Sequence, residues 1–366
     1  MSGFAAQFTG RRSVGFMVIG LVAFVAYLYF FVGFDGLIKL IETINVYQYS
    51  LFYSLAIAAV ILSVFFDSLI WHYLMKGLSV HMKFRKVMLY NWVGNFVEMV
   101  IPCETVCGEA TRIYLAGKEP ENNAGISAAT VISSRMLSTF VYMGGLMVGF
   151  VALLLTHQLP VYLLTPVIIV SVGTGAVIAI VLYIALKEGA AEKLVNLLMK
   201  AVKIIVKNPA KVEHDKESLQ KSLFSFSEAF KTYKKKPRLL IAPAIFAVIA
   251  WVFILFVYLL VFYSLGYTDI SLFALATVYC IASTVETVTA GLPVGAVEIT
   301  MINLYSLYGV PIAIAGGATT LTRLITFWCQ VLVGYPLVNF VGLKPSVSES
   351  LNVEEPIPNE MPPIIE

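Results

Sequence analysis

The sequence predicts an all-α polytopic membrane protein with about six full transmembrane helices and two pairs of shorter, broken helices. Of its 366 residues, 59% are hydrophobic and 13% are charged, whereas soluble domains carry about 25% charged residues. Apolar stretches long enough to cross a bilayer recur along the chain. The basic residues are unevenly placed, and 13 of the 25 Lys and Arg residues fall in segment 187–238. These observations favour one integral membrane domain, residues 1–344, over soluble domains.

A membrane-spanning helix needs about 20 predominantly apolar residues. Six stretches meet that requirement, and we expect each of them to cross the bilayer: residues 13–33, 46–74, 125–155, 161–186, 239–265 and 311–341. The first of them is longer than the apolar region of a signal peptide, which has about 7–15 residues, so we expect it to be retained.

Two further apolar stretches, residues 87–116 and 271–309, are interrupted in the middle by a proline beside glycines and carboxylates. Each half is too short or too polar to cross the membrane alone. They are therefore expected to form re-entrant or broken helix pairs. The residues that we expect to act as their hinges are Pro102, Gly108, Pro293 and Gly295.

The distribution of Lys and Arg predicts the orientation, because cytoplasmic loops are enriched in these residues. The opposite loops hold one basic residue, Lys39. Six crossings with two re-entrant excursions place both termini in the cytoplasm of a cell that carries the protein in its plasma membrane. The basic groups that this topology makes cytoplasmic are Arg11, Arg12, the cluster Lys76, Lys83, Arg85 and Lys86, segment 187–238 and Lys344.

Segment 187–238 contains a stretch in which apolar residues at helical spacing alternate with lysines. A basic amphipathic helix of this kind lies on an anionic leaflet, although an ordinary basic loop that sets topology explains the same charges. The lysines that would contact the cytoplasmic leaflet are Lys193, Lys200, Lys203 and Lys207. The Pro- and Glu-rich tail, residues 345–366, is expected to be a disordered acidic segment.

Two parts of the chain, residues 87–155 and 271–341, repeat the same order of polar residues. Glu109 precedes Arg135 by 26 residues, and Glu298 precedes Arg323 by 25. In the predicted topology the first unit enters the membrane from the cytoplasm and the second from outside. The pattern therefore predicts an inverted repeat, with chance similarity as the alternative because Gly, Ala and Thr are common in membrane helices.

Several charges lie at bilayer depth, where each costs about 2.5–3.5 kcal/mol on insertion scales. Arg135 lies roughly 15 Å and Arg323 roughly 18 Å into its helix. Such arginines can bind a phosphate-bearing headgroup bidentately, with Glu109, Glu298 and Arg112 as charge partners. Alternatively, each arginine pairs with a glutamate of its own unit and locks the broken helix. We expect no cofactor and no bound metal, because the Cys and His spacings match no metal pattern.

The residues of the first broken unit, Asn95, Pro102, Gly108-Glu109 and Arg112, followed by Arg135, resemble the transmembrane region of the lysylphosphatidylglycerol synthase family. A second signature, Gly291-Leu-Pro293-Val-Gly295-Ala-Val-Glu298 followed by Arg323 and Gly334, is similar to the C-terminal motif of that family. The resemblance extends over residues 11–344. One departure is that Cys103 and Glu104 stand where the family more often has a glycine and a basic residue.

This resemblance implies a flippase-like domain that moves an anionic phospholipid or a lipid-linked phosphate between leaflets. Archaeal relatives are associated with polyprenyl-phosphate sugar transfer, so a membrane-embedded transferase, with Glu104 and Glu109 as base or metal ligands, is an alternative. A scaffold that docks a partner through segment 187–238 is another. We expect no soluble aminoacyltransferase domain, no nucleic-acid partner and a membrane lipid as the partner, and leave open whether the protein forms oligomers.

Overall fold

A computed structural model describes residues 44–100, 104–119, 122–156, 224–288 and 295–341, with the isolated residues 29, 42, 172, 176, 179, 183 and 221. The regular elements within these ranges are all helical, which confirms the predicted fold class. Several predicted features lie outside the described residues: the spans 13–33 and 161–186 apart from isolated positions, Pro102 and Pro293, the lysines Lys193, Lys200, Lys203 and Lys207, and the tail 345–366.

Four described helical stretches are long and apolar enough to cross a membrane. They correspond to four of the six predicted spans. The first two are α4 (Val46–Gly77) and the first 22 residues of α7 (Ala124–Thr156). The others are η2 (Pro237–Leu240) with α11 (Ile241–Ser264), and the continuous run of α14 (Ile312–Arg323), η3 (Leu324–Cys329) and α15 (Gln330–Val341).

The helix α4 shows how these spans are specified locally. Asn45 precedes it, and its side-chain Oδ1 accepts hydrogen bonds from the backbone N–H groups of Tyr47 at 3.0 Å and Gln48 at 3.2 Å. This N-cap satisfies donors that the first turn would otherwise leave free. Large apolar side chains such as Leu51 and Ile61 are exposed, as expected for a helix that faces lipid.

The two predicted interruptions are confirmed as breaks between separate helices. The first stretch forms α5 (Phe84–Val100) and α6 (Glu104–Gly117), and the second forms α12 (Leu272–Val288) and α13 (Ala296–Leu307). At about 1.5 Å per residue, none of these four helices reaches across a hydrocarbon core of about 30 Å.

Gly108 does not lie at the break, contrary to the hinge that we expected. It lies inside α6, where a Cβ atom would come within 2.8 Å of the carbonyl oxygen of Gly94. Because α6 already begins at Glu104, the glycine allows α5 and α6 to approach closely rather than forming the hinge itself. Gly295, by contrast, immediately precedes α13 and has a φ of 100°, a conformation that favours glycine.

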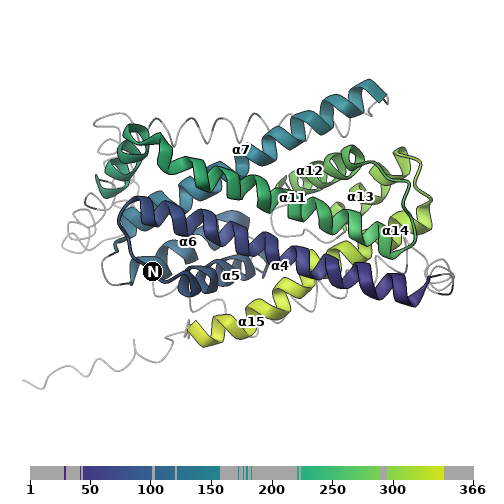
Figure 1. Cartoon of the computed structure of the whole chain (residues 1–366), viewed down its shortest axis with the longest axis horizontal. Coiled ribbons are helices and arrows are strands. Elements are labelled where there is room, and N and C mark those ends of the chain that lie inside the picture. The colour runs from purple at the N-terminus through teal and green to yellow at the C-terminus, as the bar shows by residue number, and fades with distance from the viewer. Residues whose placement is uncertain are drawn as a thin grey trace, which may run out of the picture.

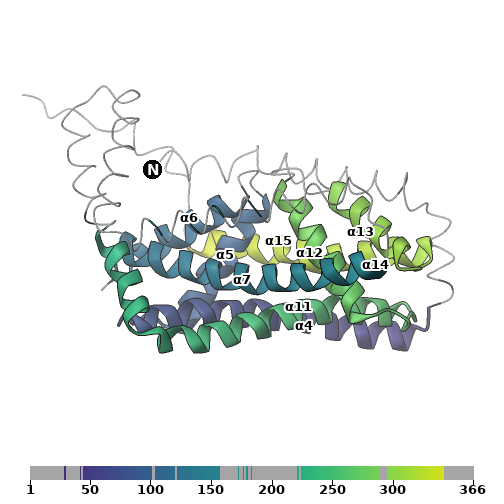
Figure 2. The same cartoon turned by 90° about the horizontal axis from the view of Figure 1, so that it is seen from above.

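The helices form two layers. In Figure 1, α4 and α11 run side by side along the long axis, and Figure 2 shows these two helices below the others. They are antiparallel, because the side chain of Gln48 at the start of α4 donates to the carbonyl of Tyr263 at the end of α11. The first broken pair lies in one half of the molecule and the second in the other, while α7 extends between them (Figure 1).

Candidate functional site

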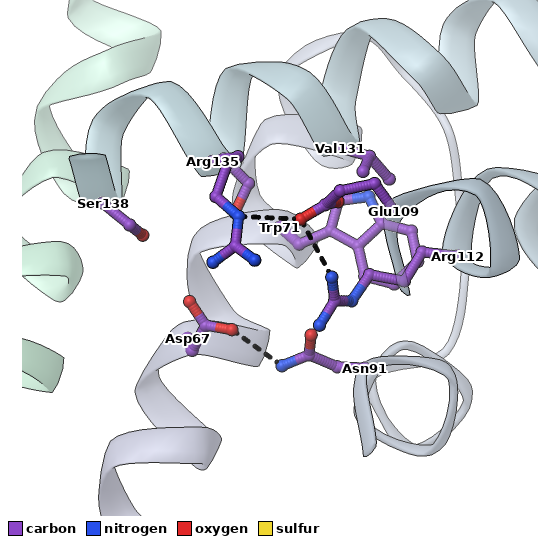
Figure 3. Close-up of a pocket in the computed structure, with 9 residues that line it drawn as sticks. Asp67, Trp71, Asn91, Glu109, Arg112, Val131, Arg135 and Ser138 are labelled. Carbon is purple, nitrogen blue, oxygen red and sulfur yellow. Dashed lines mark hydrogen bonds and ion pairs between the residues drawn. The ribbon is translucent and has the colours of Figure 1, made fainter. Parts of the chain in front are cut away.

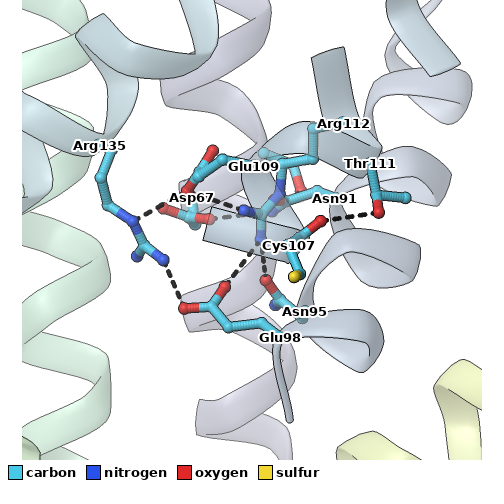
Figure 4. Close-up of polar contacts among 10 residues, drawn as sticks. Asp67, Asn91, Asn95, Glu98, Cys107, Glu109, Thr111, Arg112 and Arg135 are labelled. Carbon is cyan, nitrogen blue, oxygen red and sulfur yellow. Dashed lines mark hydrogen bonds and ion pairs between the residues drawn. The ribbon is translucent and has the colours of Figure 1, made fainter. Parts of the chain in front are cut away.

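The first broken helix is closed by an arginine from a neighbouring continuous helix. Arg135 of α7 places Nη2 2.5 Å from Oε1 of Glu98, near the end of α5, and Nε 2.9 Å from Oε1 of Glu109 in α6 (Figure 4). Glu98 and Glu109 flank the break at residues 101–103. A single guanidinium therefore links the two halves of the broken helix.

A second arginine, Arg112 of α6, joins the same carboxylates. Its Nη1 lies 2.9 Å from Oε1 of Glu109, and its Nη2 lies 3.6 Å from Oε2 of Glu98. The same Nη2 donates to Oδ1 of Asn95. Arg112 is 5% exposed, and its Nε has no hydrogen-bond partner. Ion pairs in such a buried setting depend strongly on having every partner in place.

A polar pocket opens beside this cluster (Figure 3). Arg135 has a side chain that is 39% exposed, so its guanidinium can be reached by a ligand. Opposite it, Asp67 of α4 accepts a hydrogen bond from Asn91 Nδ2 at 2.9 Å. Residues from α4, α5, α6 and α7 line the pocket: Asp67, Trp71, Asn91, Glu109, Arg112, Val131, Ser134, Arg135 and Ser138.

The second broken helix carries a matching cluster. Arg323, at the end of α14, places Nη1 3.0 Å from Oε1 of Glu286 in α12 and Nε 2.9 Å from Oε1 of Glu298 in α13. The backbone N–H of Gly295 donates to Oε2 of Glu298 at 2.5 Å. The Arg323 guanidinium lies 5.0 Å from the centre of the Phe327 ring, and its Nη2 has no hydrogen-bond partner.

The two clusters have the same design. In each, a terminal nitrogen of the arginine contacts the glutamate before the break, and Nε contacts the glutamate after it. The glutamate before the break precedes the arginine by 37 residues in both units. They differ in accessibility, because the Arg135 side chain is 39% exposed and that of Arg323 is 7% exposed.

The contact between α7 and α12 connects the two clusters. Arg135, Ser138 and Tyr142 recur at a spacing that places them on one face of α7. The Tyr142 hydroxyl donates to the carbonyl of Cys280 at 2.6 Å and lies 2.6 Å from Oγ1 of Thr284. Tyr279, also on α12, interacts electrostatically with both Arg135 and Glu286.

The structure thus places all five charged residues that we selected from the sequence in two clusters: Arg135, Glu109 and Arg112 in the first, and Arg323 and Glu298 in the second. Arg135 and Arg323 each bind the glutamates of their own unit rather than one another's. Four residues of the two clusters were not among our selected site residues: Asp67, Asn95, Glu98 and Glu286. The shared spacing of 37 residues is the sequence signal that would have identified the last two.

The fold and the two buried ion clusters define an integral membrane protein with a charged site inside a helical bundle. The chain belongs to the family described as the lysylphosphatidylglycerol synthase TM region, whose family model matches residues 17–334. This match confirms the resemblance drawn from the motifs.

Three archaeal proteins are similar to the chain, and each is named only as a UPF0104 membrane protein. The one from Methanothermobacter thermautotrophicus is 27% identical over 80% of this chain and 85% of its own length. The one from Methanocaldococcus jannaschii is 27% identical over 83% and 88%, and the one from Pyrococcus horikoshii is 25% identical over 88% and 95%. No solved structure matches the chain.

Proposed function

We propose that the protein is a flippase-like transporter that moves an anionic phospholipid or another lipid-linked phosphate between leaflets. The observation that carries this proposal is the position of Arg135, which faces a pocket while it holds both halves of a broken helix. A ligand that binds this guanidinium therefore acts directly on the contact that fixes the broken helix. Phosphate is suited to the exchange, because arginine binds its oxygens bidentately.

The exchange of partners explains why the ion pairs can open. Removing one partner from a buried ion pair costs about 3–5 kcal/mol, because the remaining charge is left uncompensated. A phosphate oxygen that replaces Glu98 or Glu109 on Arg135 keeps the guanidinium paired throughout. The freed carboxylate no longer ties its half-helix to α7, so binding of the headgroup is coupled to movement of the broken helix.

The difference between the two clusters supports an alternating-access cycle. Secondary transporters with inverted repeats expose a midplane site to one side at a time through the movement of one repeat against the other. Here the Arg135 cluster opens to a pocket, whereas Arg323 and Glu298 are buried. In this proposal the units at residues 87–155 and 271–341 form such an inverted repeat and exchange their open and closed states during transport.

Lipid translocation in proteoliposomes tests the proposal. We expect the wild-type protein to move headgroup-labelled phosphatidylglycerol or a polyprenyl phosphate faster than empty liposomes do. Arg135→Gln and Arg323→Gln should each reduce the rate about tenfold or more, because a charge-assisted hydrogen bond contributes about 1.5–3 kcal/mol. Arg238→Gln is the matched control, because Arg238 is an exposed residue of η2, and it should keep the wild-type rate.

The outcomes separate the proposal from other readings. Rates equal to those of empty liposomes for every lipid would contradict transport. Equal loss in Arg238→Gln would show that the effect comes from removing any positive charge, and not from the two clusters. A zwitterionic lipid is included in each assay, and it should move more slowly than the anionic lipids if phosphate binding by arginine selects the cargo.

A further inference from the structure

The first cluster contains more negative than positive groups. Its carboxylates are Asp67, Glu98 and Glu109, and its guanidiniums are Arg112 and Arg135. With every group ionised, three negative charges stand against two positive ones, so the cluster has one excess negative charge. A phosphodiester headgroup would add another to a site that already repels anions. The proposed cargo therefore needs a compensating positive charge when it binds.

Asp67 is the member of the cluster that can supply this compensation. Glu98 and Glu109 each contact two arginines, and nearby cations favour the ionised form of a carboxyl group. Asp67 makes no ion pair among the described residues, and its hydrogen bond comes from the neutral amide of Asn91. An anion placed beside Asp67 favours its protonated form, because like charges at short range disfavour ionisation.

We propose that Asp67 binds one proton together with each anionic headgroup, so that the protein carries a lipid phosphodiester and a proton in the same direction. This inference rests on the proposed transport function and adds its coupling ion. The proton comes from water on the side where the lipid binds, forms an O–H bond on the Asp67 carboxyl group, and returns to water when the lipid leaves. The headgroup carries one negative charge and the proton one positive charge, so the transported pair is electroneutral.

The surroundings of Asp67 were considered on every packed element. Facing it are Asn91 and Glu98 of α5, Glu109 and Arg112 of α6, and Arg135 of α7, whose charge interacts with Asp67. Residues 241–264 of α11 include no Asp, Glu, Lys, Arg or His. The remaining titratable groups of the elements that pack on α4 lie elsewhere: His72 is about 140° around α4 from Asp67 and contacts Phe84, Arg238 of η2 is exposed, and Cys329 of η3 interacts with Tyr53.

A second observation points to a ligand at this site. Arg112 lines the same pocket, is 5% exposed, and has an Nε without a hydrogen-bond partner. An unpaired buried donor is unfavourable in the absence of a ligand. The pocket therefore combines a spare guanidinium donor for the headgroup with a carboxylate that can neutralise the additional charge.

The test is the pH dependence of phosphatidylglycerol translocation in proteoliposomes, with equal pH on both sides and extraction by albumin as the readout. In the wild type, the rate should fall by about tenfold per pH unit above the midpoint, because one protonated group is required. Asp67→Asn mimics the protonated carboxyl, so it should translocate at a rate independent of pH. Asp67→Glu should restore the pH dependence.

A matched control and a direct measurement complete the experiment. Asp269→Asn changes an exposed carboxylate in the loop between α11 and α12 and should keep the wild-type profile. A pH dye inside the liposomes should acidify during inward lipid movement by the wild type, but not by Asp67→Asn. Thermal unfolding in detergent establishes that each variant is folded before its rate is interpreted.

Three results would overturn the inference: a wild-type rate independent of pH, an unchanged pH profile in Asp67→Asn, or complete loss of translocation in a folded Asp67→Asn protein. The last would mean that the ionised carboxylate is required. In the first two cases Arg135-dependent translocation persists, so transport stands and proton coupling fails. If the wild type moves no lipid at any pH, the transport proposal itself fails.

Discussion

At the scale of single residues, the charges of this protein are stabilised by partners on other helices rather than by water. Arg135 and Arg323 each contact two glutamates, and Arg112 adds Asn95 to its carboxylate contacts. The arrangement offsets the cost of placing ions at bilayer depth. Outside the membrane-spanning segments the same principle acts more weakly, and there it gives a measurable pH dependence of stability.

Glu119 follows α6 and accepts hydrogen bonds from Lys86 Nζ at 2.7 Å and from the Tyr90 hydroxyl at 2.5 Å. Partial burial alone would raise the pKa of Glu119, but the Lys86 and Tyr90 hydrogen bonds outweigh it and lower that pKa below the model-compound value of 4.5. A carboxyl group whose pKa is lower in the folded state stabilises the fold at neutral pH. This stabilisation is lost as the pH falls below 4.5 through the folded-state pKa.

We therefore expect Glu119→Gln to lower the free energy of unfolding by up to about 1 kcal/mol at pH 7, since Lys86 is half exposed and the ion pair is screened. The difference from wild type should shrink when both proteins are melted at a pH below 4. Tryptophan fluorescence of the purified protein in detergent provides the measurement. Glu228→Gln, which alters an exposed carboxylate paired with Lys231, is the control. A Glu119→Gln effect that grows in acid would contradict the assignment.

At the scale of helices, hydropathy predicted the positions of four described spans and of both breaks, because length and apolar content decide whether a helix can cross a bilayer. The partners of the arginines required the structure. Sequence order places Glu109 and Glu298 near their arginines, but the approach of Glu98 and Glu286 depends on how α5 and α12 pack. Gly108 was assigned to a hinge because a glycine beside a proline has several uses, and helix packing is one of them.

Close packing between α7 and α11 depends on one glycine of an adjacent pair. A Cβ atom at Gly145 would overlap the Trp251 ring, whereas one at Gly144 would meet nothing within 4 Å. Gly145→Ala should destabilise the protein by about 1–3 kcal/mol, the usual cost of overpacking. Gly144→Ala should leave stability unchanged or slightly increase it, because alanine favours helix. Thermal unfolding in detergent compares the two variants, and equal melting temperatures would show that Trp251 moves aside at little cost.

At the scale of the whole molecule, the order of glutamates and arginines predicted two equivalent units, and the structure shows two ion clusters of the same design. The sequence could not show that the arginines occupy separate clusters, because their separation depends on the packing of α7 against α12. That packing includes the hydrogen bonds of Tyr142 with Cys280 and Thr284. The α7–α12 contact is therefore the place where one unit can sense the state of the other.

A double-mutant cycle on this contact tests whether it holds the units together. Tyr142→Phe removes the hydroxyl that lies 2.6 Å from Oγ1 of Thr284, and Thr284→Val removes that oxygen with little change of shape. Neither residue forms an ion pair with an arginine among the described residues, so both clusters should stay intact. The coupling energy should be about 0.5–1.5 kcal/mol, the net contribution of one buried hydrogen bond. Additive losses of stability in detergent would show that this hydrogen bond does not join the units, and that the surrounding apolar contacts between α7 and α12 do so instead.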